Sequence, residues 1–208
     1  AGDGTDTLVI AGADNVDTAA DAARYTNFET ITVAADQDAS LIAGITTVNV
    51  AAATSATLTK LSVAQAGAIT VTGDQATDLT LVLNSAAGTA DAVTVNLASA
   101  TTTAEVDIVG LKVAGVETLT LNATTGVNVA GTWADAATND VTFVAGSADK
   151  LTSVKITGTK DTSLDTGGNI TLAVAIDASA SEGDFLFTGD LTLGSTVTGT
   201  ALADSVTV

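Results

Sequence analysis

Residues 1–10 read AGDGTDTLVI, a glycine- and aspartate-rich turn that feeds a short apolar strand, and residues 199–208 read GTALADSVTV, a similar figure. Glycine permits backbone angles that other residues avoid, and aspartate favours turns. Both ends of the chain therefore carry the same turn-then-strand landmark. A landmark that recurs at both ends predicts a repeat architecture, with the chain as a fragment of a longer array.

Short strand patterns run through the sequence between these two landmarks. Apolar residues alternate with polar ones in DTLVI (6–10), DAVTVNL (91–97), VETLTL (116–121) and SVKITG (153–158). Such alternation predicts strands, and Gly, Asn, Asp and Ser cluster between them as turn residues. Only residues 17–28 and 132–138 have a helical pattern. The sequence therefore predicts an all-β protein.

A longer repeat, an aspartate followed by a glutamate one strand later, divides the chain into modules. Asp6 is followed by Glu29 in FETITV, and Asp91 is followed by Glu117 in VETLTL. We interpret the two glutamates as solvated charges at strand edges. Asp204 opens a further copy, so we expect a first module at 1–90, a second at 91–203 and the start of a third at 204–208.

The intervals between Asp6, Asp91 and Asp204 are 85 and 113 residues, which leaves two architectures open. One is a parallel β-helix or β-roll-like solenoid whose loops differ in length. The other is a series of tandem β-sandwich modules. Aromatic residues make up only 3% of the chain, and small and β-branched side chains dominate its apolar share. This composition favours the solenoid, because sandwiches place larger side chains on their inner faces.

Charge and residue usage exclude several function classes. The net charge is −18, the sign opposite to that of nucleic-acid binders, so no nucleic-acid partner is expected. No stretch approaches the ~18 consecutive apolar residues of a membrane-spanning helix. The chain has no His and no Cys, the usual bases and nucleophiles, so we do not expect an enzyme. An excess of carboxylates instead attracts cations such as Ca²⁺.

The first nine residues, AGDGTDTLV, resemble the nonapeptide G-G-x-G-x-D-x-U-x (U apolar) of RTX calcium-binding repeats. Residues 199–207 keep its first Gly, Asp204 and Val206, and residues 179–187 keep Asp184 and Leu186. The rest of the chain resembles bacterial surface-layer (S-layer) and RTX surface proteins, through GVETLTL (115–121), the segment 176–208, abundant Thr and Ala, and the absence of Cys.

The resemblance implies Ca²⁺ in the turns of a β-roll, held by aspartate carboxylates and backbone carbonyls. Carried onto this sequence, the expected metal ligands are Asp3, Asp6, Asp184 and Asp204, and internal equivalence adds Asp91, Asp74 and Asp190. For each of these the alternative is an ordinary turn in which the carboxylate accepts a backbone hydrogen bond.

The resemblance also implies a biological setting. It predicts type I secretion, a location on the outer cell surface, and calcium-dependent self-assembly into a lattice or filament. A cell-surface polysaccharide would be contacted by parts that are not in this chain. The alternative function is a stalk or binding module of a secreted RTX-type adhesin.

Overall fold

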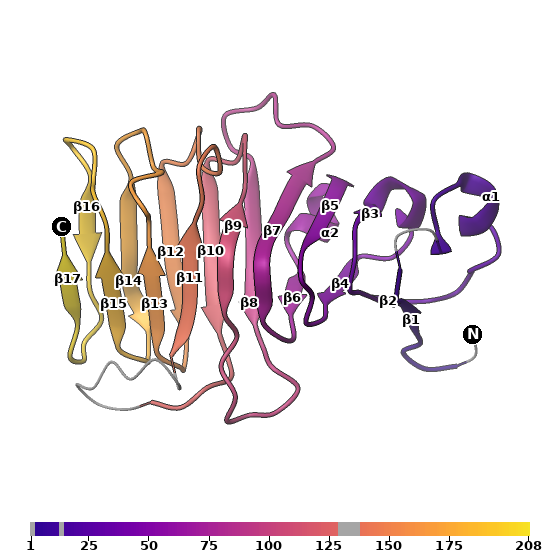
Figure 1. Ribbon diagram of the computed structural model, residues 1–208, viewed down its shortest axis with the longest axis horizontal. Coiled ribbons are helices and arrows are strands. Elements are labelled where there is room, and N and C mark those ends of the chain that lie inside the picture. The colour runs from indigo at the N-terminus through magenta and orange to yellow at the C-terminus, as the bar shows by residue number, and fades with distance from the viewer. Residues whose placement is uncertain (1–2, 13–14, 129–137) are drawn as a thin grey trace.

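The computed structural model describes residues 3–12, 15–128 and 138–208, and these form a parallel β-solenoid of about eight turns. The strands stack side by side along the long axis of a rod, from the N-terminal to the C-terminal end (Figure 1). The solenoid predicted from the sequence is confirmed. The tandem β-sandwich alternative is wrong, because every strand pair that is described is parallel.

Each coil contributes one strand to each of two sheets. The first sheet has nine strands, in the order β1 (Thr7–Ile10), β2 (Thr30–Val33), β4 (Thr47–Val50), β6 (Ile69–Val71), β8 (Ala92–Leu97), β10 (Thr118–Ala123), β12 (Ser153–Gly158), β14 (Ala175–Ser181) and β16 (Thr196–Thr198). The second has eight, β3 (Gln37–Asp38), β5 (Ala56–Leu61), β7 (Gln75–Leu83), β9 (Ile108–Lys112), β11 (Asn139–Phe143), β13 (Thr162–Asp165), β15 (Phe185–Thr188) and β17 (Ser205–Thr207).

Three short helical turns lie in the N-terminal part of the rod: α1 (Ala19–Ala22), the 3₁₀ turn η2 (Ala39–Ile42) and α2 (Val63–Ala66). The helix expected at 17–28 is thus a single turn, and the one expected at 132–138 falls almost wholly outside the described residues. Each turn is capped at its start by a side chain, from Thr18, Asp38 and Ser62 respectively.

The core is a set of columns in which the same inward position of successive coils is filled by a small or branched apolar side chain. Val93, Leu119, Val154 and Ile176 are in register across four strands of the first sheet, and all are at most 1% exposed. Strands lie about 4.8 Å apart, so such side chains touch along the axis. Small and branched side chains, which dominate the apolar share of the sequence, therefore also fill the core.

Both sheets continue across the expected module boundary at residues 90 and 91, since β6 pairs with β8 and β7 pairs with β9. Asp6 and Asp91 directly precede strands of the first sheet. Asp204 directly precedes β17 of the second sheet, so the third landmark lies half a coil out of phase with the first two.

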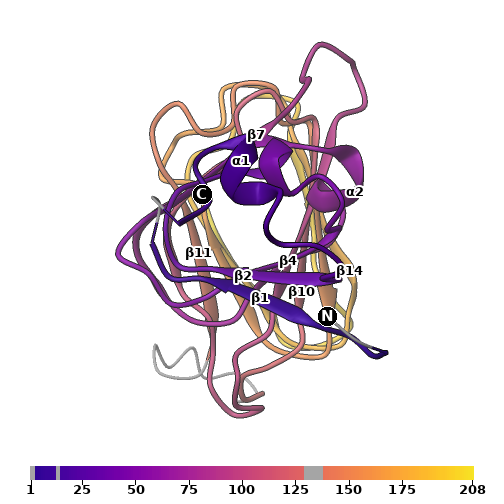
Figure 2. The same cartoon turned by 90° about the vertical axis from the view of Figure 1, so that its right-hand side faces the viewer.

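The solenoid also twists along its axis. Seen from the N-terminal end, β1 and β2 run at a large angle to β11 behind them (Figure 2). Such twist is the normal consequence of the handedness of L-residues in strands. As a result, the two ends of the rod present their edge strands in different directions.

Candidate functional site

The expected metal ligands lie on several different turns. Asp6 and Asp91 precede β1 and β8 of the first sheet, Asp184 and Asp204 precede β15 and β17 of the second, Asp190 follows β15, and Asp3 is exposed near the N-terminus. Asp74 precedes β7 of the second sheet. The two TGD turns that suggested an equivalence of Asp74 and Asp190 therefore lie on opposite sides of the coil.

Asp91 is bonded to the next coil through its backbone. Its N–H donates to Oε2 of Glu117 at 2.8 Å, and its carbonyl accepts from the N–H groups of Glu117 and Thr118 at 3.0 and 3.1 Å. Its carboxylate accepts from the N–H of Gly88 at 3.1 Å. The carboxylate thus closes the turn before β8, as the ordinary turn alternative expects.

Asp6 and Glu29 repeat this arrangement one coil from the N-terminus. The N–H of Asp6 donates to Oε2 of Glu29 at 2.8 Å, and the carbonyl of Asp6 accepts from the N–H groups of Glu29 and Thr30 at 3.2 and 3.1 Å. Glu29 and Glu117 are therefore hydrogen-bond acceptors for the preceding coil, a role that the interpretation as solvated edge charges did not include, although Glu29 is exposed.

The carboxylate of Asp204 accepts three hydrogen bonds. It accepts from the N–H and the hydroxyl of Thr200 at 2.7 and 2.8 Å, and from the N–H of Phe185 at 3.0 Å. A Cβ on Gly199 would lie 2.2 Å from Oδ2, so a larger residue there would require the side chain of Asp204 to move. Asp204 therefore organises its own turn and ties it to the coil before.

Aspartate recurs at the corner where the chain enters the second sheet. Six of the described strands of this sheet are directly preceded by one, and we call these residues the Asp corner: Asp36, Asp74, Asp107, Asp161, Asp184 and Asp204. Asp36, Asp107 and Asp161 were not predicted from the sequence. The signal that would have found them is an aspartate immediately before most of the second-sheet strands.

Members of the Asp corner hold neighbouring coils together. Asp36 accepts from the N–H of Thr57 at 2.8 Å, Asp74 from that of Asp107 at 3.1 Å, and Asp161 from that of Asp184 at 2.8 Å. The side chain of Asp184 is itself buried, with 4% exposure. A carboxylate that accepts backbone N–H bonds replaces the strand pairing that is lost where the chain turns.

Like charges meet in the middle of the Asp corner. Burial and, to a smaller extent, the negative charges of Asp140, Asp74 and Glu105 together raise the pKa of Asp107 to about 6. Asp107 also accepts from the N–H of Asp140 at 3.3 Å, a bond that acts in the opposite direction.

The predicted ligand residues form only part of the arrangement that a calcium site requires. Within the described ranges, no three acidic, His or Cys side chains converge in a way that could hold a metal ion. The carboxylates of Asp91 and Asp204 are already turned toward backbone donors, and Ala1 and Gly2 of the nonapeptide lie outside the described residues. The observed role of these carboxylates is to cap coils, and calcium binding at their turns stays a prediction.

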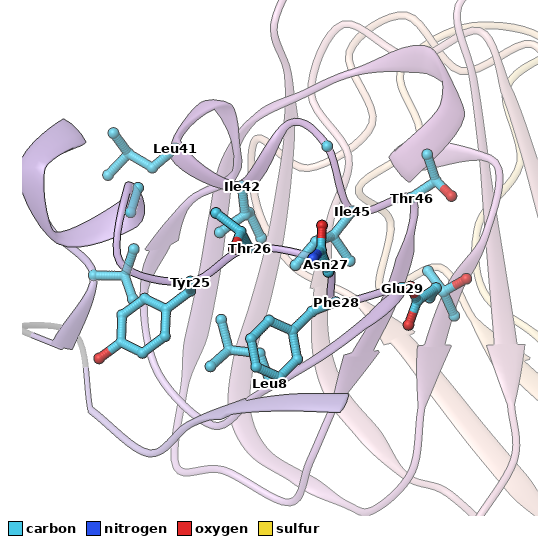
Figure 3. A pocket seen from close by; sticks show the side chains of 14 residues that line it. Leu8, Tyr25, Thr26, Asn27, Phe28, Glu29, Leu41, Ile42, Ile45 and Thr46 are labelled. Atoms are coloured by element: carbon cyan, nitrogen blue, oxygen red, sulfur yellow. The ribbon is translucent and has the colours of Figure 1, made fainter. Parts of the chain in front are cut away.

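A cavity of about 610 Å³ opens near the N-terminal end, between α1, η2 and the starts of β1, β2 and β4 (Figure 3). Its walls combine polar groups with the apolar and aromatic side chains of Leu8, Val16, Tyr25, Phe28, Ile42 and Ile45. Polar groups come from Thr26, Asn27 and Thr46, and Asn27 has a left-handed φ of 61°. The cavity has the size of a small-molecule site.

No protein-family model matches the chain, and no curated protein and no solved structure is significantly similar to it. Among the helices that the structure describes, none is long and apolar enough to cross a membrane. The geometry described above is therefore the basis for a functional proposal.

Proposed function

We propose that the chain is a structural protein of the S-layer type, which self-assembles outside the cell into a calcium-dependent lattice or filament. The observation that carries the proposal is the rod itself, in which the recurring carboxylates of the Asp corner hold one coil to the next. These acidic side chains have a structural use in building an elongated body, and such a body suits a surface layer.

Calcium dependence follows from electrostatics. A net charge of −18 on a 208-residue chain makes copies repel one another. Within one copy, the negative charges of Asp74 and Asp140 also repel that of Asp107. Divalent cations with a preference for oxygen ligands reduce this repulsion. We therefore propose that Ca²⁺ lowers the free-energy cost of contact between copies. Anchoring to a surface polysaccharide would use parts outside this chain.

The second candidate is a stalk or binding module of a secreted RTX-type adhesin. The same elongated rod (Figure 1) supports it, because a stalk needs length and rigidity but no contact between copies. The two proposals differ in whether the protein self-associates when calcium is added.

A calcium titration of chelator-treated protein tests the proposal. Circular dichroism, sedimentation velocity and negative-stain electron microscopy are recorded on the same samples, with Mg²⁺ at equal ionic strength as the control. Ordered sheets or fibres that appear with Ca²⁺ but not with Mg²⁺ support the surface-layer function. A protein that is folded and monomeric at every calcium concentration overturns it and favours the stalk.

A further inference from the structure

The two sheets of the solenoid differ in charge. Among the strands that the structure describes, six of the eight in the second sheet contain a charged residue, whereas seven of the nine in the first sheet contain none. The two exceptions, Lys155 of β12 and Asp177 of β14, carry opposite charges and are in register with each other. The strands of the first sheet therefore have no net charge, on a chain whose net charge is −18.

Hydroxyl and amide side chains form two columns on the outer face of this sheet, at its centre. Thr94 and Thr120 are in register in one column, and Thr70, Asn96 and Asn122 in the other. All five alternate with buried apolar residues of β6, β8 and β10, so they point outward, and all are half-buried. Strands about 4.8 Å apart bring the members of a column within reach of each other.

Hydrogen bonds between side chains order the second column. Nδ2 of Asn122 donates to Oδ1 of Asn96 at 2.8 Å, and Oγ1 of Thr157 on β12 donates to Oδ1 of Asn122 at 3.3 Å. Nδ2 of Asn96 donates to the carbonyl of Ile69 at 3.2 Å. These bonds use one of the two N–H groups of each amide. The face is thus ordered before any contact, which reduces the entropy that a partner's binding would cost.

The carboxylates beside this face are directed at the backbone. Asp91 and Glu117 lie in the turns that precede β8 and β10. The carboxylate of Asp91 accepts from the N–H of Gly88, and that of Glu117 accepts from the N–H of Asp91. The outward positions of β6, β8 and β10 themselves contain only uncharged side chains.

Charge identifies the partner that this face fits. The strands of the second sheet carry four aspartates against two lysines, and the Asp corner runs along the same sheet. Two copies that met through it would bring carboxylates together, whereas the first sheet avoids this repulsion. Amide and hydroxyl groups both donate and accept hydrogen bonds, so the first-sheet face is also complementary to itself.

We propose that the outer face of β6, β8 and β10 is the contact surface for the same face of a second copy of this chain, with the two rods side by side. The twist of the solenoid (Figure 2) limits the contact to these central strands. Three strands about 4.8 Å apart bury less than the roughly 1,200–2,000 Å² of stable pairs, so the dimer is weak and forms at high local concentration. The inference rests on the proposed self-assembly and names the face that it uses.

Sedimentation equilibrium over a range of concentrations, with Ca²⁺ and with chelator, measures the contact. Thr94→Glu brings two like charges into its centre, so we expect the dimer dissociation constant to rise about 10-fold or more. Thr80→Glu is the matched control, because Thr80 is a half-buried, outward residue of β7 in the second sheet and the variant has the same net charge. We expect it to dimerise like the wild type. Circular dichroism establishes that both variants fold.

The outcomes separate this face from the proposed function. If Thr94→Glu dimerises as tightly as the wild type, the face is wrong and self-assembly stands. If both variants lose association equally, net charge decides and the face is again wrong. A wild type that stays monomeric under all conditions overturns the face and the self-assembly together. A monomeric wild type that a dextran matrix retains, and Thr94→Glu that it does not, would assign the face to a neutral polysaccharide and exclude the second copy.

Cross-linking gives a second measurement, since the chain has no cysteine of its own. Thr120→Cys puts a single thiol on the first-sheet face, and Thr142→Cys puts one at an outward, half-buried position of β11 in the second sheet. With a short bifunctional maleimide, we expect a covalent dimer from Thr120→Cys but not from Thr142→Cys. Absence of the cross-link in a Thr120→Cys protein that dimerises like the wild type overturns the proposed face.

Discussion

The carboxylate of Glu117 accepts a hydrogen bond of 2.8 Å from the backbone N–H of Asp91, and the carbonyl of Asp91 accepts one from the N–H of Glu117 in return. Glu29 and Asp6 form the same reciprocal pair. In each case the glutamate lies one coil further along the solenoid. These pairs start the parallel register of β1 with β2 and of β8 with β10.

Removal of this glutamate acceptor will destabilise the fold. Glu117→Ala leaves the N–H of Asp91 without its partner, and we expect the free energy of unfolding to fall by about 1 kcal/mol, because a half-exposed N–H regains part of its bonding from water. Glu117→Gln keeps an acceptor oxygen and will lose about half as much. Urea denaturation followed by circular dichroism measures both.

Glu182→Ala is the control for Glu117→Ala, because Glu182 is exposed in the turn between β14 and β15. That variant is expected to change the free energy of unfolding by less than about 0.5 kcal/mol. Equal effects of the two alanine variants would show that the bond to Asp91 contributes nothing specific.

The sequence was enough to predict the solenoid and the recurrence of the Asp6–Glu29 and Asp91–Glu117 pairs. It was not enough to predict what the glutamates do. The pairs are 23 and 26 residues apart, so coil length varies, and only the three-dimensional register places each glutamate beside the aspartate of the coil before. Turns of variable length obscure the repeat period in the sequence, whereas the strands of successive coils stay in register in the fold.

The Asp corner is a second case. Asp74 and Asp107 of this corner, and Asp140 inside β11, are spaced by 33 residues each, a regularity that is visible in the sequence. Asp107 and Asp140 were nevertheless missed, because the RTX-like pattern directs attention to glycine-flanked aspartates and these two lack such glycines. The raised pKa of Asp107 depends on burial and on charges from other coils, which a sequence pattern does not contain.

Protonation of Asp107 will stabilise the protein. Its pKa is about 6 in the folded chain against an ordinary value of 3.8, so the folded state binds the proton more tightly than the unfolded state. The destabilising charge is absent below pH 3.8, grows as the pH rises through this window, and is fully present above pH 6. Asp107→Asn removes the charge and keeps an acceptor for the N–H of Asp140.

We therefore expect Asp107→Asn to be more stable than the wild type by about 1 kcal/mol near neutral pH, a value reduced by solvent screening at this half-exposed site. The difference narrows as the pH falls from 6 toward 3.8. Urea denaturation at several pH values measures it, with Asp190→Asn at an exposed aspartate as the control. A difference that does not depend on pH would contradict the role of Asp107.

Close stacking of coils makes Gly158 irreplaceable. Its φ is 105°, and a Cβ there would lie 2.1 Å from the carbonyl oxygen of Ala123 on the neighbouring strand. Gly158→Ala therefore combines backbone strain with a clash, and we expect a loss of about 3 kcal/mol or more. The midpoint of urea denaturation measures this loss.

Gly146→Ala separates the two causes. Gly146 also has a positive φ, 74°, but no heavy atom lies within 4 Å of its Cβ position. This variant carries the backbone strain alone, so a loss of about 1 kcal/mol is expected. If Gly146→Ala lowers the free energy of unfolding as much as Gly158→Ala does, then the close contact with Ala123 contributes nothing to the loss.

Asp6 is the aspartate best matched to the RTX-like pattern, so it provides the sharpest test of calcium binding at a turn. Asp6→Ala is expected to remove one bound Ca²⁺ and to leave the remaining affinities unchanged, because the predicted ligands lie on separate turns. Isothermal titration calorimetry with chelator-treated protein measures stoichiometry and affinity. Asp190→Ala, at the exposed aspartate that follows β15, tests a second predicted ligand in the same way. Unchanged stoichiometry in the Asp6 variant would refute its assignment.

Gln65 organises the wall of the N-terminal cavity from inside the protein. Its side chain is fully buried, and Nε2 donates to the carbonyls of Ala39, Ile42 and Ile45 at 3.2, 3.3 and 3.1 Å. Gln65→Leu has a similar volume but cannot donate, so these buried carbonyls lose that partner. We expect a loss of about 3 kcal/mol in the free energy of unfolding.

Hydrogen exchange will locate the effect of Gln65→Leu, since amides of residues 39–45 should exchange faster while those of β10 and β12 stay protected. Val63→Ala, on the same turn but 86% exposed, is the control and should alter neither stability nor exchange measurably. Uniformly faster exchange along the whole rod would contradict a local role. It would mean instead that Gln65 supports the cooperative unit of the entire solenoid.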